Sequence, residues 1–275
     1  GIPDGGQDGP ARVAPTCSSW ALAGPAKELT SLPAPAVRVG ERYAVLSKSS
    51  NNLGADVARY APDLTFSWFD PQTGSFSTPR TPFGSRSTSD GGAVVAYGPA
   101  IPSAIILTVQ GFAIAWTAYR QSKTSAYFAL LDATGNALSQ PLTLDGQAER
   151  VGDVIGDGSQ FAVGWIAAMG SVRLARVDSQ GNLIGITEVA PQSYIGPMRL
   201  FWDGEAYGVF WENSLPNLNE VWFARVDREG VIQSAPVQLS NPDCYGGRMQ
   251  VEATENGYLV YWRENPKVNA CIPSS

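Results

Sequence analysis

Hydrophobic and polar residues alternate along most of the chain, in short runs separated by glycine, proline, asparagine and aspartate. The stretches "AYGVFWEN", from 206 to 213, and "EVWFARVD", from 220 to 227, are two such runs. A period of two residues is typical of β-strands with their side chains on opposite faces of a sheet. The pattern therefore predicts many short strands joined by tight turns.

The alternating runs recur as one unit. Three copies align by eye, over residues 108–144, 155–190 and 201–240, and the segments 254–266 and 39–50 match the first half of the unit. A tryptophan closes the first run of each strong copy and a serine takes its place in the weak one: Trp116, Trp165, Trp211, Trp262 and Ser47. The tryptophans are 49, 46 and 51 residues apart, and Ser47 precedes Trp116 by 69. The chain is therefore interpreted as a repeat protein.

The second half of the unit has its own marker, a strand that ends in aspartate and is followed by a turn with glycine. The pairs are Asp70 with Gly74, Asp132 with Gly135, Asp178 with Gly181, and Asp227 with Gly230. An aspartate side chain accepts backbone N–H groups in such a turn, and glycine adopts the positive φ that the turn needs.

A repeat of 40 to 50 residues with four short strands is the signature of a β-propeller blade. We therefore predict an all-β fold, a single five-bladed β-propeller, with a β-sandwich of chance similarity as the alternative. The expected repeats span 36–83, 93–146, 147–191, 194–240 and 244–275. Because the last repeat is too short for four strands, residues 17–32 are expected to complete it, and residues 1–16 to form a flexible tether.

Composition agrees with this picture and narrows the function classes. Hydrophobic residues make up 44% of the 275 residues and charged residues only 16%, with 29 glycines and 20 prolines for turns. The net charge of −6 argues against nucleic acid or an anionic membrane surface as a partner. No uninterrupted apolar run of membrane-spanning length is present, so no transmembrane span is expected.

The chain contains no histidine, which excludes catalytic devices of the Ser-His-Asp and Cys-His kinds. The three cysteines lack metal-ligand spacing, so we expect no metal and no cofactor. A disulfide between Cys244 and Cys271 is expected, with Cys17 to Cys271 as the alternative.

Two groups of charged residues fall on the expected first, innermost strands of the repeats. Asp153 and Glu252 are the acids left once Asp203 is assigned to a turn, and they are the alternative catalytic pair for glycoside hydrolysis. Arg150, Arg199 and Arg248 follow at intervals of 49 and 49. Two interpretations of these arginines stand: an anion-binding site at one mouth of the channel, or ion pairs with nearby acids.

The motif W-D-G-x-x-[YF]-x-V-x-W, followed by A-R-V-x-x-x-G, resembles a repeat of secreted proteins and lipoproteins of Gram-negative soil bacteria. Its best copy here comprises Trp202, Asp203, Gly204, Tyr207, Val209, Trp211, Ala224, Arg225, Val226, Asp227 and Gly230. The resemblance implies export and a propeller-like array, and it implies no activity. The opening "GIPDGGQDGP" resembles the tether behind the lipid-bearing cysteine of a lipoprotein, although no cysteine starts this chain. Two interpretations stand: a lipid anchor lost from the N-terminus, or a tether that is simply a disordered start, and the second is preferred.

These observations predict a non-catalytic, exported module for binding or assembly, in the periplasm, on the outer membrane as a lipoprotein, or outside the cell. One propeller face would recognise its ligand, most simply a protein partner or an envelope complex, with carbohydrate as a further candidate partner. The alternative is a carbohydrate-binding lectin or a glycoside hydrolase with inward-facing carboxylates. The repeated tryptophans are expected to pack between blades rather than to bind sugar.

Overall fold

The computed structural model describes residues 35–48, 64–83, 100–120, 123–191, 196–215, 218–240, 244–254 and 257–266. All of them belong to the compact unit Leu32–Ser275. The strands are β1 (Ala36–Val39), β2 (Arg42–Lys48), β3 (Leu64–Asp70), β4 (Ser75–Phe76), β5 (Ala100–Leu107), β6 (Gly111–Arg120), β7 (Lys123–Asp132), β8 (Leu142–Asp145), β9 (Ala148–Gly156), β10 (Gln160–Ala167), β11 (Val172–Asp178), β12 (Leu183–Ala190), β13 (Met198–Trp202), β14 (Ala206–Leu215), β15 (Leu218–Asp227), β16 (Val237–Gln238), β17 (Cys244–Thr254) and β18 (Gly257–Pro266). One short 3-10 turn, η1 (Ala168–Gly170), links β10 to β11.

Each predicted repeat folds as its own antiparallel sheet. The first to fourth sheets are β1–β4, β5–β8, β9–β12 and β13–β16, each with its strands in chain order, and the fifth sheet contains β17 and β18. The all-β class and the four-stranded unit are therefore confirmed. A β-sandwich would combine the strands into two sheets, and the described strands do not do so.

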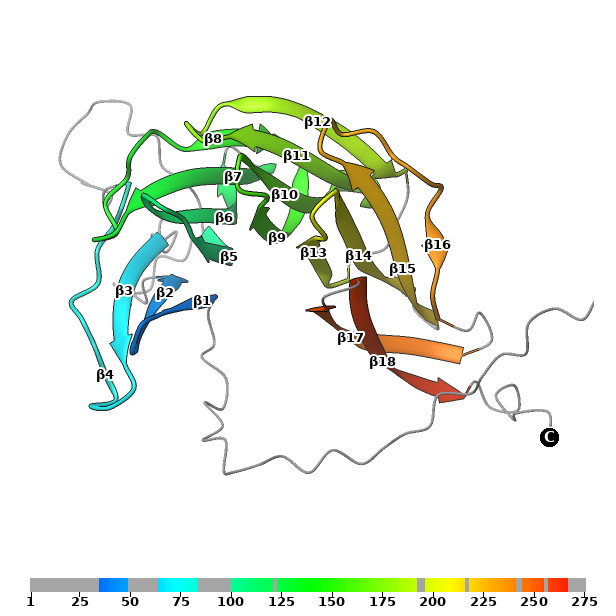
Figure 1. The fold of residues 1–275 in the computed structure, drawn as a ribbon, viewed down its shortest axis with the longest axis horizontal. Coiled ribbons are helices and arrows are strands. Elements are labelled where there is room, and N and C mark those ends of the chain that lie inside the picture. Colours follow the sequence, from blue (N-terminus) through cyan, green and yellow to red (C-terminus); the bar gives the residue numbers. More distant parts are fainter. Residues whose placement is uncertain are drawn as a thin grey trace, which may run out of the picture. The chain divides into compact units, whose positions relative to one another are not determined.

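Consecutive sheets pack against one another, and in Figure 1 they follow in chain order from blue to red. The first strands β1, β5, β9 and β13 contact one another in series. At the end of the series, β17 contacts β14 and β15. The architecture is propeller-like, with the first strand of each complete sheet beside the first strand of the next.

An inner sheet is covered on both faces, so its central strands carry apolar side chains on both sides. On β14, Tyr207, Val209 and Trp211 pack toward the third sheet, while Phe210 packs toward Val251 and Tyr258 of the fifth. Gly208 leaves room for the latter contact, because a Cβ at this position would lie 2.8 Å from a ring atom of Tyr258. Small residues among the large ones therefore set how closely the sheets approach.

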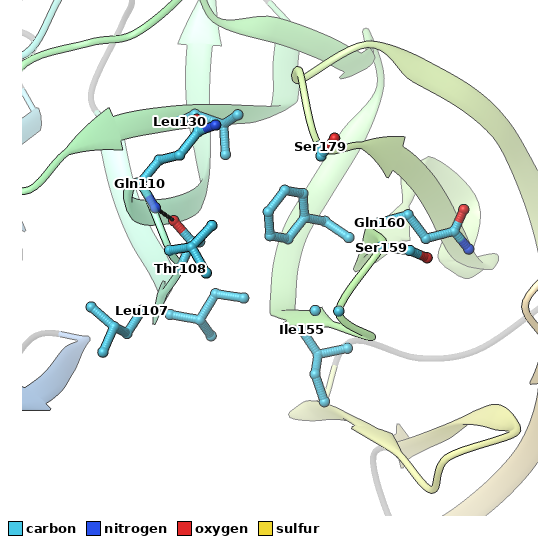
Figure 2. A pocket seen from close by; sticks show the side chains of 13 residues that line it. Leu107, Thr108, Gln110, Leu130, Ile155, Ser159, Gln160 and Ser179 are labelled. Atoms are coloured by element: carbon cyan, nitrogen blue, oxygen red, sulfur yellow. Dashed lines mark hydrogen bonds between the residues drawn. The ribbon is translucent and has the colours of Figure 1, made fainter.

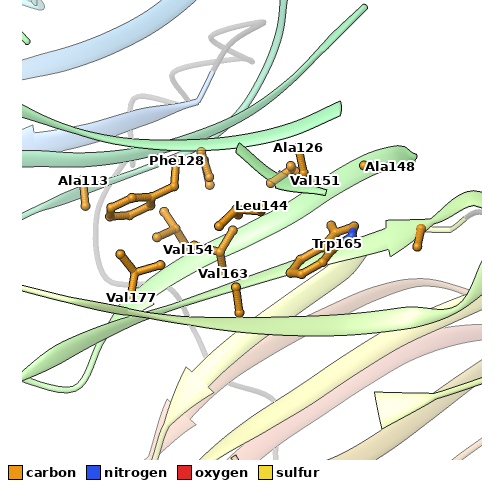
Figure 3. Close-up of a cluster of buried hydrophobic side chains, with 14 of the residues drawn as sticks. Ala113, Ala126, Phe128, Leu144, Ala148, Val151, Val154, Val163, Trp165 and Val177 are labelled. Carbon is orange, nitrogen blue, oxygen red and sulfur yellow. The ribbon is translucent and has the colours of Figure 1, made fainter. Parts of the chain in front are cut away.

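The repeated tryptophans pack between sheets, as predicted. Trp116 lies in a cluster with Ala44 and Leu46 of the first sheet, and Trp165 lies with Phe128 of the second sheet in the cluster that Figure 3 shows. Trp211 packs against the third sheet, and the partly buried Trp262 packs against the fourth. Trp116, Trp165 and Trp211 are buried in the core and cannot stack on a sugar.

The predicted aspartate turns are confirmed as well. Oδ1 of Asp132 accepts the backbone N–H groups of Thr134, at 2.8 Å, and Asn136, at 2.9 Å. Oδ1 of Asp227 accepts the N–H of Val231 at 2.7 Å, and Gly230 of the same turn has φ 89°. The expected tether 1–16 and the strands expected within 17–32 lie outside the described residues.

Candidate functional site

Among the predicted site residues, Asp153 is a carboxylate that accepts hydrogen bonds from two neighbouring sheets. It lies on β9, and its Oδ1 accepts the N–H of Val154 at 2.9 Å. Its Oδ2 accepts the N–H of Leu200, on β13 of the next sheet, at 3.0 Å. Burial raises the pKa of Asp153 to about 6, although these two N–H groups and the charge of Arg199 act in the opposite direction. A carboxyl group with such a pKa can exchange a proton near neutral pH.

The three predicted arginines all fall on the first strands of their sheets. Arg150 lies on β9 and Arg199 on β13, and both are exposed. Arg199 donates from Nη1 to the carbonyl of Met198 at 3.0 Å, and its charge lowers the pKa of Asp153. Arg248 lies on β17, but its side chain is outside the described part of the structure. A shared anion site therefore stays a prediction.

Glu252, the second predicted carboxylate, is exposed on β17. The hydroxyl of Tyr261, on β18, lies 3.1 Å from Oε1 of Glu252 and 2.7 Å from Oε1 of Gln250. Among the described residues, no hydrogen bond or ion pair joins Glu252 to Asp153. Their pairing across a channel stays a hypothesis.

The remaining predictions concern cysteines, metals and membranes. The side chains of Cys17, Cys244 and Cys271 lie outside what the structure describes, so the disulfide stays a prediction. In the described ranges, no group of three or more cysteine, aspartate or glutamate side chains could hold a metal ion. The same ranges contain no helix that could span a membrane.

A polar cleft that the sequence did not predict lies between the first and second sheets, with a volume of about 590 Å³. We call it the Arg–Trp cleft; it is lined by Arg42, Trp68, Ser77, Thr78, Arg80, Ala133 and Thr134. The turn between β7 and β8 contributes the last two of these residues, and the first sheet and the segment after β4 contribute the others. Residues far apart in the sequence therefore form one surface.

The Arg–Trp cleft presents two oriented guanidinium groups. The Arg42 guanidinium lies over the ring of Trp68, 4.9 Å from its centroid, and Nη1 of Arg80 donates to Oδ1 of Asn136 at 3.1 Å. Oγ of Ser77 accepts the N–H of Trp68 at 2.9 Å, which leaves its hydroxyl proton free to donate. None of the described residues that line the cleft is acidic. The cleft is therefore rich in donors and carries positive charge.

Comparison with known proteins gives structural matches only. No protein-family model and no curated protein matches the chain. The subtype N10 neuraminidase-like protein of the A/little yellow-shouldered bat strain matches with a TM-score of 0.50 at 12% identity, over 81% of this chain and 71% of that one. The GH43 endo-arabinanase from Bacillus licheniformis has a TM-score of 0.44 at 12% identity, over 83% and 92%. The α-L-arabinanase of Cellvibrio cellulosa has 0.43 at 11%, over 86% and 87%.

These matches correct the functional prediction. The main prediction, a non-catalytic module for binding or assembly, is contradicted by the match with a TM-score of 0.50, because that structure is named a neuraminidase-like protein. This match agrees better with the alternative, a lectin or a glycoside hydrolase. At these identities the likeness establishes only the propeller-like fold, so the activity of this chain is a matter of proposal. The resemblance to repeats of exported bacterial proteins stays a prediction.

Proposed function

We propose that the chain binds carbohydrate, and that the Arg–Trp cleft binds a sugar unit bearing a carboxylate. The observation that carries the proposal is the meeting of Arg42 and Arg80 in one cleft with Trp68 and three hydroxyl side chains. A guanidinium group donates two parallel hydrogen bonds to a carboxylate, and serine and threonine hydroxyls suit the hydroxyls of a sugar.

The packing of Arg42 supports this assignment. Its guanidinium group is held over the Trp68 ring, so ligand binding would restrict less side-chain freedom than binding to a freely rotating arginine. Because no acidic side chain lines the cleft, a ligand carboxylate would not have to displace an intramolecular carboxylate there, and Arg80 would exchange only its bond to the Asn136 amide oxygen. The expected ligand is therefore an oligosaccharide that contains uronic acid.

Calorimetric titration with oligogalacturonate tests the proposal, with the neutral galactose oligomer as comparison. We expect saturable binding of the acidic oligomer and at least tenfold weaker binding by the double variant Arg42→Gln, Arg80→Gln. Arg38→Gln is the matched control, because Arg38 is exposed on β1, does not line the cleft, and donates to the Gly40 carbonyl. Equal affinities of the double variant and the wild type, or no binding of either oligomer, would refute the proposal.

Glycoside hydrolysis is a second candidate, and Asp153 is the observation that favours it. A general acid for this reaction needs a raised carboxyl pKa, and burial raises that of Asp153 to about 6. Asp153→Asn should lower the release of reducing ends from a polysaccharide panel by about 100-fold or more. The exposed Glu229→Gln variant should keep the activity of the wild type. Full activity of Asp153→Asn would remove this candidate.

The proposal includes five blades and an exported location. Four sheets of four strands are followed by a sheet of two, and a blade of four strands needs two more. We assign these two strands to residues 17–32, which lie outside the described residues. Export accords with the resemblance in the repeat motif and with a carbohydrate ligand outside the cytoplasm.

A further inference from the structure

The contact between the third and fourth sheets is closed by a polar cluster. The hydroxyl of Tyr207 donates to Oδ2 of Asp157 at 2.7 Å, and Nε of Arg228 contacts the same oxygen at 3.0 Å. The Asp157 side chain has no exposed surface. We call Asp157, Tyr207 and Arg228 the polar lock of this junction.

The repeat identifies the equivalent positions between the second and third sheets. Tyr207 stands four residues before Trp211, and Phe161 stands four residues before Trp165. In the same way, Thr108 precedes Trp116 by eight residues, as Asp157 precedes Trp165.

The third equivalence comes from the turn aspartates. Arg228 follows Asp227, and Ser179 follows Asp178 at the same place in the third sheet. The tyrosine, aspartate and arginine of the lock are thus replaced by phenylalanine, threonine and serine. These three residues cannot form an ion pair, and phenylalanine has no hydroxyl to donate.

All three replacements, Thr108, Phe161 and Ser179, line a cavity of about 600 Å³. Figure 2 shows it between Thr108 and Leu130 on one side and Ile155 and Ser159 on the other. We call this cavity the junction pocket. It shares no lining residue with the Arg–Trp cleft. The missing lock and the pocket therefore coincide at one junction.

The walls of the junction pocket are mainly apolar. Ile106, Leu130, Ile155 and Phe161 contribute to them. Leu107 and Val109 line the pocket too, and they are 51% and 103% exposed. Apolar side chains that line an exposed hollow are typical of a binding site. Their contact with water is unfavourable, and a bound apolar ligand would remove it.

Several polar groups at the pocket are already engaged. Oγ1 of Thr108 accepts the N–H groups of Gln110, at 3.2 Å, and Gly111, at 3.1 Å. Oγ of Ser159 donates to Oδ1 of Asp157 at 2.8 Å, and the Gln160 amide donates to the Arg228 carbonyl at 2.8 Å. No acidic or basic residue is among the described residues that line it. A charged ligand, or a sugar with many hydroxyls, would lose its hydration there without replacement.

We infer that the junction pocket is a binding site for an uncharged, mainly apolar small molecule with an aromatic or alicyclic skeleton. The volume falls within the range of small-molecule sites, about 300 to 1,000 Å³. Phe161 offers the ligand an aromatic surface, and Leu107 and Val109 would become covered on binding. The inference is independent of the carbohydrate proposal, because the two sites have different residues and opposite polarity.

Binding of N-phenyl-1-naphthylamine, an uncharged fluorescent probe, tests the inference. The wild type should bind one molecule per chain, with a saturable rise in fluorescence. Thr108→Asp, Phe161→Tyr and Ser179→Arg together would rebuild the polar lock and should weaken binding at least tenfold. The matched control is Thr143→Asp, Phe76→Tyr and Ser234→Arg, which makes the same changes at exposed positions outside the pocket. It should bind as the wild type does.

Gly156→Leu provides a second test if the rebuilt lock prevents folding. A Cβ at Gly156 would lie 3.5 Å from Phe161 and 3.8 Å from Ile106, so the added side chain would occupy the pocket. This variant should also lose at least tenfold in affinity while retaining the circular dichroism spectrum of the wild type. Unchanged affinity in a folded filling variant, or no saturable binding by the wild type, would overturn the inference. Tighter binding of the anionic 8-anilinonaphthalene-1-sulfonate, or displacement of the probe by a neutral oligosaccharide, would also overturn it.

Discussion

The hydroxyl of Tyr207, on the fourth sheet, donates a hydrogen bond of 2.7 Å to Oδ2 of Asp157, in a turn of the third. Oδ1 of the same carboxylate accepts the N–H groups of Ser159, at 2.8 Å, and Gln160, at 2.9 Å. Burial opposes ionisation of Asp157, but these hydrogen bonds outweigh it and lower its pKa to about 2. One side chain therefore stabilises its own turn and links two sheets.

Replacing Tyr207 by phenylalanine should destabilise the fold. The change removes a hydrogen bond to a buried carboxylate, and such a bond contributes about 1.5–3 kcal/mol. We expect a loss of that size in the free energy of unfolding, measured with urea at pH 7. Tyr261→Phe is the matched control, because Tyr261 is exposed on β18, and it should cost less than about 0.5 kcal/mol. Equal losses would show that the Tyr207 hydroxyl has no special role.

The Asp157 turn shows how far the sequence could predict the structure. Asp157 and Gly158 occupy the place that Asp203 and Gly204 hold in the repeat motif, so the motif predicts a turn there, whose hydrogen bonds join residues two and three positions apart. The strands and sheets could be predicted because each sheet pairs strands that follow one another in the chain, and the inter-sheet tryptophans because they recur at one place in each repeat. The link to Tyr207 spans 50 positions, and no local pattern reveals such a partner.

The candidate ligand sites could be predicted only in part. Asp153 and Arg199 were singled out from their places in the repeat, and the charge of Arg199 does act on the Asp153 carboxyl. The Arg–Trp cleft was missed because Arg42 and Thr134 are brought together only by the packing of two sheets. The main functional prediction was wrong because the recurring residues determine the scaffold, and a scaffold is compatible with many functions.

The position of Trp165 predicts a large cost of truncation. Its side chain has no exposed surface, and Nε1 donates to Oδ2 of Asp145 at 3.1 Å. Trp165→Ala would leave a cavity between the second and third sheets and should cost about 3–5 kcal/mol in the free energy of unfolding. Trp222→Ala, at a partly buried position, should cost less. Urea unfolding followed by circular dichroism measures both, and the opposite order would contradict the assigned packing.

Completion of the fifth blade can be tested by truncation. Among the described strands, β18 pairs with β17 alone and thus has one unpaired edge. If residues 17–32 supply its next strand, deletion of residues 1–32 should expose that edge and cause aggregation. Size-exclusion chromatography and thermal unfolding measure the outcome, and deletion of residues 1–16 is the control. A monomeric protein with the melting temperature of the full chain would show that the fifth blade is completed in another way.

Asp153 should make the stability of the fold depend on pH in a range where few other groups titrate. Its folded-state pKa, about 6, lies above the ordinary aspartate value of 3.8, so the folded protein binds the proton more tightly than the unfolded chain does. The stabilisation is therefore complete below about pH 4 and is lost as the pH rises through 6, by on the order of 3 kcal/mol.

Because the chain has no histidine, no imidazole obscures this range, and the free energy of unfolding can be compared directly between pH 4.5 and 7.5. Asp153→Asn should remove the decrease, whereas Glu252→Gln, at an exposed carboxylate, should retain it. If Asp153→Asn shows the same decrease as the wild type, another group titrates in this range. The raised pKa of Asp153, on which the proposed general acid depends, would then be refuted.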